Sequence, residues 1–178
     1  MRQLDNPDIY WSSYNLRISQ HKVFKGGAKR GKSSTGWFYG FKLHVVINHV
    51  GELLAIWVTP GNVDDREPVP GLCRGIFGKL LADKGYISQK LTQTLKEKGI
   101  QLLHKVRKNM KSIPLEPFDK MLLDHRSVIE TVFDQLKNLC QIEHTRHRSA
   151  YNFSVNLMSG IIAYCFQPIK PKMPIYTT

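Results

Sequence analysis

The chain has few cysteines, and they are not spaced for a shared function. Cys73, Cys140 and Cys165 are odd in number, and no two of them stand in a C-x-x-C pair. A small secreted domain would show an even, closely spaced set, so the sequence predicts a reducing compartment and excludes a disulfide framework. Cys140, His144 and His147 follow the pattern C-x3-H-x2-H, but no fourth zinc ligand stands nearby. Basic residues at a helix end are the preferred interpretation.

Long apolar segments are lacking as well. Residues 1–6 do not contain the apolar core of a signal peptide. The longest apolar run near the C-terminus, residues 157–166, is too short to span a bilayer. These two features predict a soluble cytoplasmic protein without a membrane partner.

Acidic residues are scarce relative to basic ones. The 178 residues include 26 lysines and arginines against 14 aspartates and glutamates, a formal net charge of +12. Five cations lie between Lys22 and Lys32, and four lie between Lys105 and Lys111. Clustered positive charge favours a polyanion as partner, most often nucleic acid. The candidate phosphate contacts in these clusters are Lys29, Arg30, Lys32, Arg107 and Lys108.

The hydrophobic content of 42% is ordinary, and the length suits one domain over residues 1–178. Within it we expect a basic N-terminal segment, 1–35, and a proline-rich tail, 168–178. After an antiparallel hairpin, strand-like and helical sequence alternate, which predicts an α/β fold with a mixed sheet. Strands are expected at 37–48, 53–59, 80–82 and 101–106. Helices are expected near 66–77, 89–98 with Ser88 as N-cap and Gly99 as C-cap, 119–139 and 150–166.

The segment 125–137 is the most informative part of the chain, because it combines R-x3-E-x6-K with helical sequence. At about 100° per residue, Glu130 falls roughly 40° and Lys137 roughly 20° from Arg126. With Phe133 as the exception, the apolar side chains gather on another face: Val128, Ile129, Val132, Leu136 and Leu139. The pattern predicts a helix that presents a carboxylate flanked by two cations. This arrangement suits a glutamate that holds a metal ion against a nucleic-acid phosphate.

Asp83 follows the short apolar segment 80–82 and precedes Gly85. A carboxylate at a strand end can bind a divalent ion, although an aspartate that simply forms a turn is the commoner case. Asp83 and Glu130 together, in a basic chain, favour a site. Two ions held between carboxylates can activate an attacking oxygen and stabilise a leaving one in phosphoryl transfer.

Two further motifs have competing interpretations. Residues 26–33 match the phosphate-binding pattern G-x4-G-K-S, but no buried strand precedes them and no helix follows. We favour a basic loop that touches DNA phosphates and keep nucleotide hydrolysis as an alternative. Trp37, Phe38 and Tyr39 have rings that can stack on bases, although half of such a strand is expected to be core.

With these residues in hand, the chain resembles the catalytic domain of DDE-type insertion-sequence transposases, in particular the family numbered nine hundred and eighty-two. The resemblance covers residues 4–167. It rests on H-K-V-F at 21–24, K-R-G-K-S at 29–33, G-W-F-Y-G-F-K-L-H at 36–44, T-P-G-N-V-D-D at 59–65, A-D-K-G-Y at 82–86 and I-E-T-V-F-D-Q-L-K at 129–137.

The resemblance implies a ribonuclease-H-like fold, a mixed five-stranded sheet flanked by helices. It implies strand cleavage and transfer at transposon ends with Mg²⁺ or Mn²⁺, a homo-oligomer on transposon-end and target DNA, and a place at the bacterial nucleoid. Asp83 matches the second catalytic, metal-binding aspartate, and Glu130 matches the glutamate. Arg126 and Lys137 match the Y-R-E-K signature as DNA contacts, with Leu123 at the tyrosine position.

The first catalytic aspartate of the family opens a motif like I-D-S-T on the first strand. An ungapped alignment places Asn6 there. One inserted residue places Asp5 there, which we take as the third catalytic and metal-binding carboxylate; Asp8 fits less well. Pro7 is unfavourable in a central strand. Family members carry a longer N-terminal region that recognises the element's ends, so the chain is expected to be truncated. The alternative is a catalytically inactive DNA-binding remnant.

Overall fold

The computed structural model describes residues 2–5, 24–33, 36–105, 115–143, 147 and 149–174, with the backbone alone at Arg2, Leu4, Asp5 and Ser33. The strands are β1 (Arg2–Asp5), β2 (Lys29–Ser33), β3 (Gly36–Asn48), β4 (Leu53–Pro60), β5 (Gly78–Ala82) and β6 (Ile100–His104). The helical segments are α1 (Val69–Leu72), η2 (Lys84–Tyr86), α2 (Gln89–Glu97), α3 (Pro117–Asp124), α4 (Val128–Asp134), η3 (Gln135–Leu139) and α5 (Ala150–Cys165).

The sheet is mixed, as predicted. β1 lies between β3, to which it is antiparallel, and β5, to which it is parallel. β5 pairs in parallel with β6, and β4 pairs antiparallel with β3. The order β4-β3-β1-β5-β6 is the expected five-stranded sheet. The structure adds β2, a strand that the sequence analysis missed, along the first half of β3.

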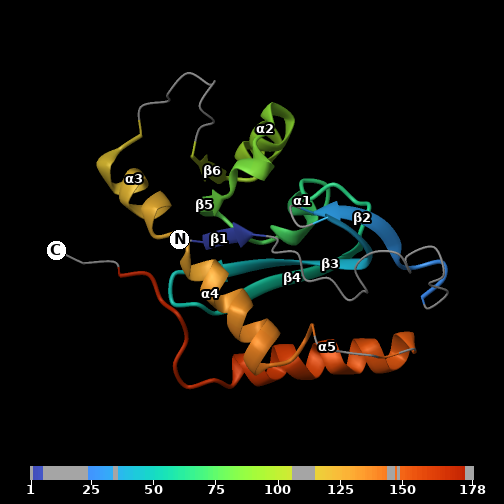
Figure 1. Ribbon diagram of the computed structural model, residues 1–178. Coiled ribbons are helices and arrows are strands. Elements are labelled where there is room, and N and C mark those ends of the chain that lie inside the picture. Colours follow the sequence, from blue (N-terminus) through green and yellow to red (C-terminus); the bar gives the residue numbers. More distant parts are fainter. Residues whose placement is uncertain are drawn as a thin grey trace.

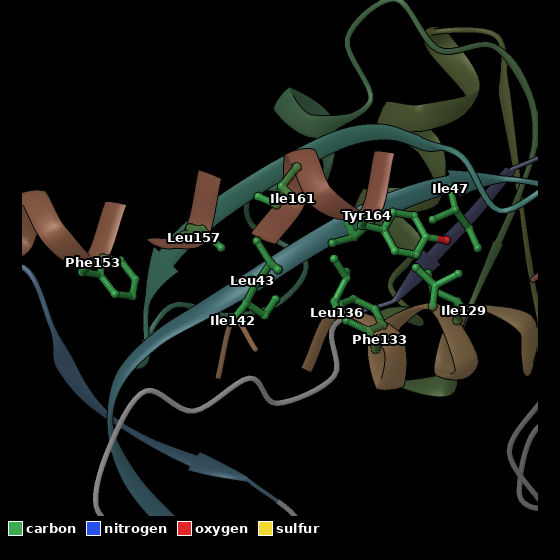
Figure 2. Packing of buried hydrophobic residues seen from close by; sticks show 12 residues of the cluster. Leu43, Ile47, Ile129, Phe133, Leu136, Ile142, Phe153, Leu157, Ile161 and Tyr164 are labelled. Atoms are coloured by element: carbon green, nitrogen blue, oxygen red, sulfur yellow. The ribbon is translucent and has the colours of Figure 1, made fainter. Parts of the chain in front are cut away.

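Helices cover both faces of this sheet (Figure 1). Leu43, Val45 and Ile47 of β3 are fully buried against α4 and α5, and Figure 2 shows Leu43 and Ile47 in this packing. Val46 points to the opposite face, where α1 and α2 pack. Side chains on both faces of β3 are therefore buried, as expected for a central strand. Leu81 packs with α3 in a third cluster. The predicted α/β fold, a sheet flanked by helices, is confirmed.

Local signals placed several elements correctly. The Ser88 hydroxyl accepts a hydrogen bond from the Leu91 amide at 3.3 Å, and Gly99 has φ of 72°, so both predicted caps of α2 are confirmed. The helix expected at 66–77 is much shorter in the structure, where α1 has only four residues. Gly75 has φ of 76°, a conformation that favours glycine and ends the helical path soon after α1.

Among the helices that the structure describes, none combines the length and the apolar character that a membrane span requires.

The predicted continuous helix over 125–137 is wrong. α3 ends at Asp124, residues 125–127 form a turn, α4 begins at Val128, and a π-helical segment, η3, follows. Leu122 and Leu123 of α3 pack with β5 and β6, whereas α4 packs against β3. The chain bends between the helices because one straight helix would not cover both regions of the sheet.

The expected apolar stripe is also corrected. Phe133 lies one turn after Ile129, and its side chain is 2% exposed. Leu139 is 67% exposed, because the wider turn of η3 changes the angular spacing after α4. The docking face of α4 and η3 is therefore formed by Ile129, Val132, Phe133 and Leu136.

Candidate active site

The predicted carboxylates at the strand ends occupy neighbouring positions in the sheet. β1 and β5 are parallel, and Leu4 of β1 is in register with Ala82 of β5. Asp5 is the last residue of β1, and Asp83 directly follows β5. Their backbones therefore lie side by side at the carboxyl ends of two adjacent parallel strands. In open α/β sheets, ligands bind at this edge.

Asp83 is an accessible, charged group. It caps the short helix η2 with extended backbone, and its side chain is 44% exposed. Its Oδ1 atom accepts a hydrogen bond from the Arg126 guanidinium and forms an ion pair with it. Partial burial raises the pKa of Asp83, but hydrogen bonds from the Lys84 amide and from Arg126 outweigh this and leave the pKa below its ordinary value. The carboxylate is therefore ionised at neutral pH.

Arg126 connects this edge of the sheet to the segment that carries Glu130. The amide nitrogen of the buried Gln3 side chain, on β1, donates a hydrogen bond to the Arg126 carbonyl oxygen. The same carbonyl accepts the Ile129 amide at 3.3 Å, at the beginning of α4. Glu130 lies in the first turn of α4 and is exposed. Asp83 thus contacts Arg126, and Glu130 stands four residues further along the chain.

The predicted arrangement of one carboxylate between two cations on a single helix face is wrong. Arg126 lies in the turn before α4 and reaches Asp83. Lys137 lies in η3, and its Nζ is 3.5 Å from the carboxylate of Glu143. The angles calculated from the sequence do not apply, because they assume an unbroken α-helix.

The residue types of the candidate donor set, all carboxylates, suit a divalent ion. Carboxylate oxygens are the ligands that Mg²⁺ prefers, and both Asp83 and Glu130 are accessible. Arg126 now holds one oxygen of Asp83, so it would have to release that oxygen to a cation. Among the described side chains, no three His, Cys, Asp or Glu residues are grouped closely enough to hold a metal. The Asp5 side chain is not among those described.

The part of the first basic cluster from Lys29 to Lys32 lies on a strand, so the predicted basic loop is wrong there. Lys29, Arg30 and Lys32 lie on β2 with exposed side chains. A P-loop would need a loop followed by a helix, so the β2 strand also excludes the nucleotide-binding interpretation of G-x4-G-K-S. Other predicted positions lie outside the described residues: Asn6, Pro7, Asp8, Arg107, Lys108 and His144.

Sequence analysis missed a buried ionic group beside β2. Lys42 is 8% exposed, and its Nζ donates to the Val63 carbonyl at 2.9 Å and to Asp65 at 2.7 Å. His44, on the same side of β3, shares a 2.8 Å hydrogen bond with the Thr59 hydroxyl, and burial lowers its pKa to about 4. These groups fix the segment after β4. The sequence did contain a signal for these buried groups, because a lysine and a histidine alternate with apolar residues in 41–47.

The order of the sheet and the acidic residues at its carboxyl edge define a ribonuclease-H-like α/β domain. The particular family follows from a family model described as "Transposase DDE domain", which matches residues 7–150. The chain belongs to this transposase DDE domain family. The predicted resemblance is thereby confirmed, and membership implies use of a divalent metal ion.

A solved transposase structure agrees with this assignment in fold. A piggyBac transposase in a synaptic complex with hairpin DNA aligns with a TM-score of 0.58 and 11% identity over 92% of this chain. The chain spans 45% of the length of that transposase. The catalytic core domain of BIV integrase aligns with a TM-score of 0.49 and 12% identity over 91% of this chain and 80% of the integrase chain. No curated protein matches the chain.

Proposed function

We propose that this chain is the catalytic domain of an insertion-sequence transposase that cleaves and transfers DNA strands with a divalent metal ion. One observation carries the proposal: Asp5 and Asp83 end adjacent parallel strands, and Arg126, from the turn before the Glu130 helix, contacts Asp83. Membership of the DDE family supports the same reaction. The proposal includes a single domain over 1–178 that acts at the bacterial nucleoid.

Three carboxylates are proposed to hold the metal, Mg²⁺ or Mn²⁺: those of Asp5, Asp83 and Glu130. Bound ions would help to activate the attacking oxygen and to stabilise the leaving one. Asp83 is suited to this role because its carboxylate is exposed directly after the end of β5. Arg126 forms an ion pair with Asp83 and would contact a DNA phosphate if Asp83 bound a cation instead.

Basic residues are proposed to hold the DNA of the transposon ends and of the target. Arg30 and Lys32 are exposed on one face of β2 and Lys29 is exposed on the other, so the ribbon offers cations to the DNA backbone. Arg107 and Lys108 belong to the second basic cluster of the sequence. Arg126 and Lys137 are proposed to act on phosphates close to the reacting bond.

Removal of metal should stop strand cleavage but not DNA binding. We expect the chain to nick a duplex bearing the element's end in Mg²⁺ or Mn²⁺, to lose this activity in EDTA, and to recover it when Mg²⁺ is restored. Gel analysis of the nicked strand and calorimetric titration of the metal measure the two effects. Nicking that continues in EDTA contradicts the proposed function. Salt-sensitive DNA binding without metal binding or nicking supports the inactive remnant.

The outer face of α5 supports the proposed homo-oligomer. At about 100° per residue, Tyr151, Val155, Met158 and Ile162 fall within roughly 60° of one another, and all are exposed. Phe153, Leu157, Ile161 and Tyr164 form a second stripe on the opposite side, buried against the sheet. A helix that is apolar on both faces is normally buried on both faces. We call the exposed set, together with Phe166, the α5 stripe.

We propose that a second copy of this chain covers the α5 stripe. Helix α5 contains no Asp, Glu, Lys or Arg, so two chains of net charge +12 can meet there without opposed like charges. The helix also offers no cation to DNA phosphates. A stable interface needs about 800 Å² from each partner. The helix of 16 residues is about 24 Å long, and the exposed Phe166 and Ile169 extend the apolar surface beyond it.

A charge in the α5 stripe should dissociate this oligomer. We expect Ile162→Glu to convert a dimer into a monomer, because the carboxylate would be desolvated in the interface. Light scattering coupled to gel filtration, over a range of concentrations with and without DNA, measures the mass. Ser154→Glu is the matched control, because Ser154 is exposed on α5 outside the stripe. A wild-type chain that is monomeric throughout, or an Ile162→Glu chain that remains dimeric, rules this interface out.

A further inference from the structure

The two-stranded ribbon of β2 and β3 places cations beside an exposed aromatic ring. Lys32 pairs with Trp37 and Arg30 pairs with Tyr39 across the strands, so these four side chains share one face. Phe38, on the other face, is fully buried. Trp37 is 48% exposed, with the Arg30 guanidinium 4.4 Å and the Lys32 ammonium 5.7 Å from its ring centroid.

This face lines a pocket of about 440 Å³, here called the basic pocket. Its wall includes Arg30, Lys32, Trp37, Lys42, Arg66 and Gly85. Its shape depends on close backbone packing between β2 and the segment after β4. A methyl group on Gly31 would stand 2.2 Å from the Gly61 carbonyl oxygen and 2.5 Å from the Phe38 ring. Any side chain at Gly31 would therefore push β2 away from the segment after β4.

The basic pocket adjoins the candidate active site. Gly85 lies in η2, two residues beyond Asp83, and is part of the pocket wall. Two acidic residues, Asp64 and Asp65, also line the pocket, and each is paired with a cation of the wall. Lys42 forms an ion pair with Asp65, and the Arg66 Nε donates to the Oδ1 of Asp64 at 2.8 Å. The pocket therefore lies next to the segment that carries Asp83, and its wall contains an aromatic ring and several cations.

We propose that the basic pocket takes one unpaired nucleotide of the DNA substrate, with its base stacked on Trp37 and its phosphates on Arg30 and Lys32. The inference rests on the proposed function, which makes a DNA strand the ligand at Asp83. Aromatic rings stack on any base, and neighbouring cations bind the backbone, which is the chemistry of single-strand recognition. A site for duplex phosphates alone would need the cations and not the exposed indole.

A fluorescent base analogue tests the stacking directly. A duplex with 2-aminopurine at an unpaired 3′-terminal position is mixed with the chain in EDTA, so that no cleavage follows. We expect the wild type to quench the 2-aminopurine and to bind this duplex more tightly than a blunt one. Trp37→Ala should lose the quenching and bind the unpaired end roughly tenfold more weakly, with blunt-duplex binding unchanged. Trp37→Phe should retain most of the quenching and most of the affinity for the unpaired end.

The matched control is Trp57→Ala, because Trp57 is similarly exposed, at 47%, and does not line the pocket. Circular dichroism of each variant confirms that it is folded. Wild-type binding without quenching, or equal losses in Trp37→Ala and Trp57→Ala, overturns the stacking site. Because the measurement is made without metal, it is separate from the test of the proposed reaction: a chain that nicks DNA but does not quench would retain its function and lose this subsite.

Discussion

Replacing Glu130 by glutamine should abolish metal-dependent nicking and leave salt-sensitive DNA binding close to that of the wild type. The amide keeps the size of the side chain but removes the negative charge that would hold the cation. A metal contributes several kcal/mol of transition-state stabilisation, so the rate should fall by about 1000-fold or more. Since Glu130 is exposed on α4, the fold should not change. Single-turnover nicking assays and fluorescence anisotropy at several salt concentrations measure the two properties.

Glu97→Gln is the control for this substitution. Glu97 is also an exposed helical glutamate, but it lies on α2, which packs on the opposite face of the sheet from α4. The Glu97→Gln variant should nick DNA at the same rate as the wild type. If Glu130→Gln nicks DNA as fast as the wild type does, Glu130 has no part in the mechanism, and the proposed set of three carboxylates fails.

Truncating Phe133 to alanine should destabilise the fold strongly, whereas the same change at Leu139 should have little effect. Phe133 is buried between α4 and the central strand β3 (Figure 2), and removal of such a ring costs about 3–5 kcal/mol. Leu139 projects from η3 and is mostly exposed, so Leu139→Ala should stay within about 0.5 kcal/mol. Urea unfolding followed by circular dichroism gives both free energies of unfolding.

This pair of variants distinguishes the structure from a regular helix over the whole segment. A continuous helix with Leu139 in the docking stripe predicts the larger loss at Leu139. Similar losses at the two positions would mean that η3 does not turn Leu139 away from the core. The m-values should remain equal, since neither variant changes the surface exposed on unfolding by much.

Local sequence was sufficient wherever neighbouring residues decide the conformation. The 37–48 and 53–59 segments became β3 and β4 because aromatic and β-branched residues were followed by turn residues. Helix α2 was bounded correctly, since Ser88 and Gly99 cap their own helix. Asp83 was recognised as a strand-end carboxylate for the same reason. The resemblance to DDE transposases added Asp5, which composition and periodicity did not single out.

Contacts between distant segments could not be derived in this way. The bend at 125–127 arises because α3 and α4 pack on different strands, and it redirects Arg126 toward Asp83, 43 residues earlier. β2 was taken for a loop, since its sequence is basic and its pairing with β3 is a tertiary feature. Lys42 and Asp65 each look like an ordinary polar residue until the hairpin brings them together.

The sequence by itself determined the family, the central hairpin and two of the candidate acidic residues, because those depend on motifs and on short-range periodicity. Only the tertiary structure decided which groups meet: the adjacent ends of β1 and β5, the Arg126–Asp83 ion pair and the basic pocket beside Trp37. The physical reason is that register between parallel strands and the packing of helices on a sheet are set by the whole core. No single segment contains that information.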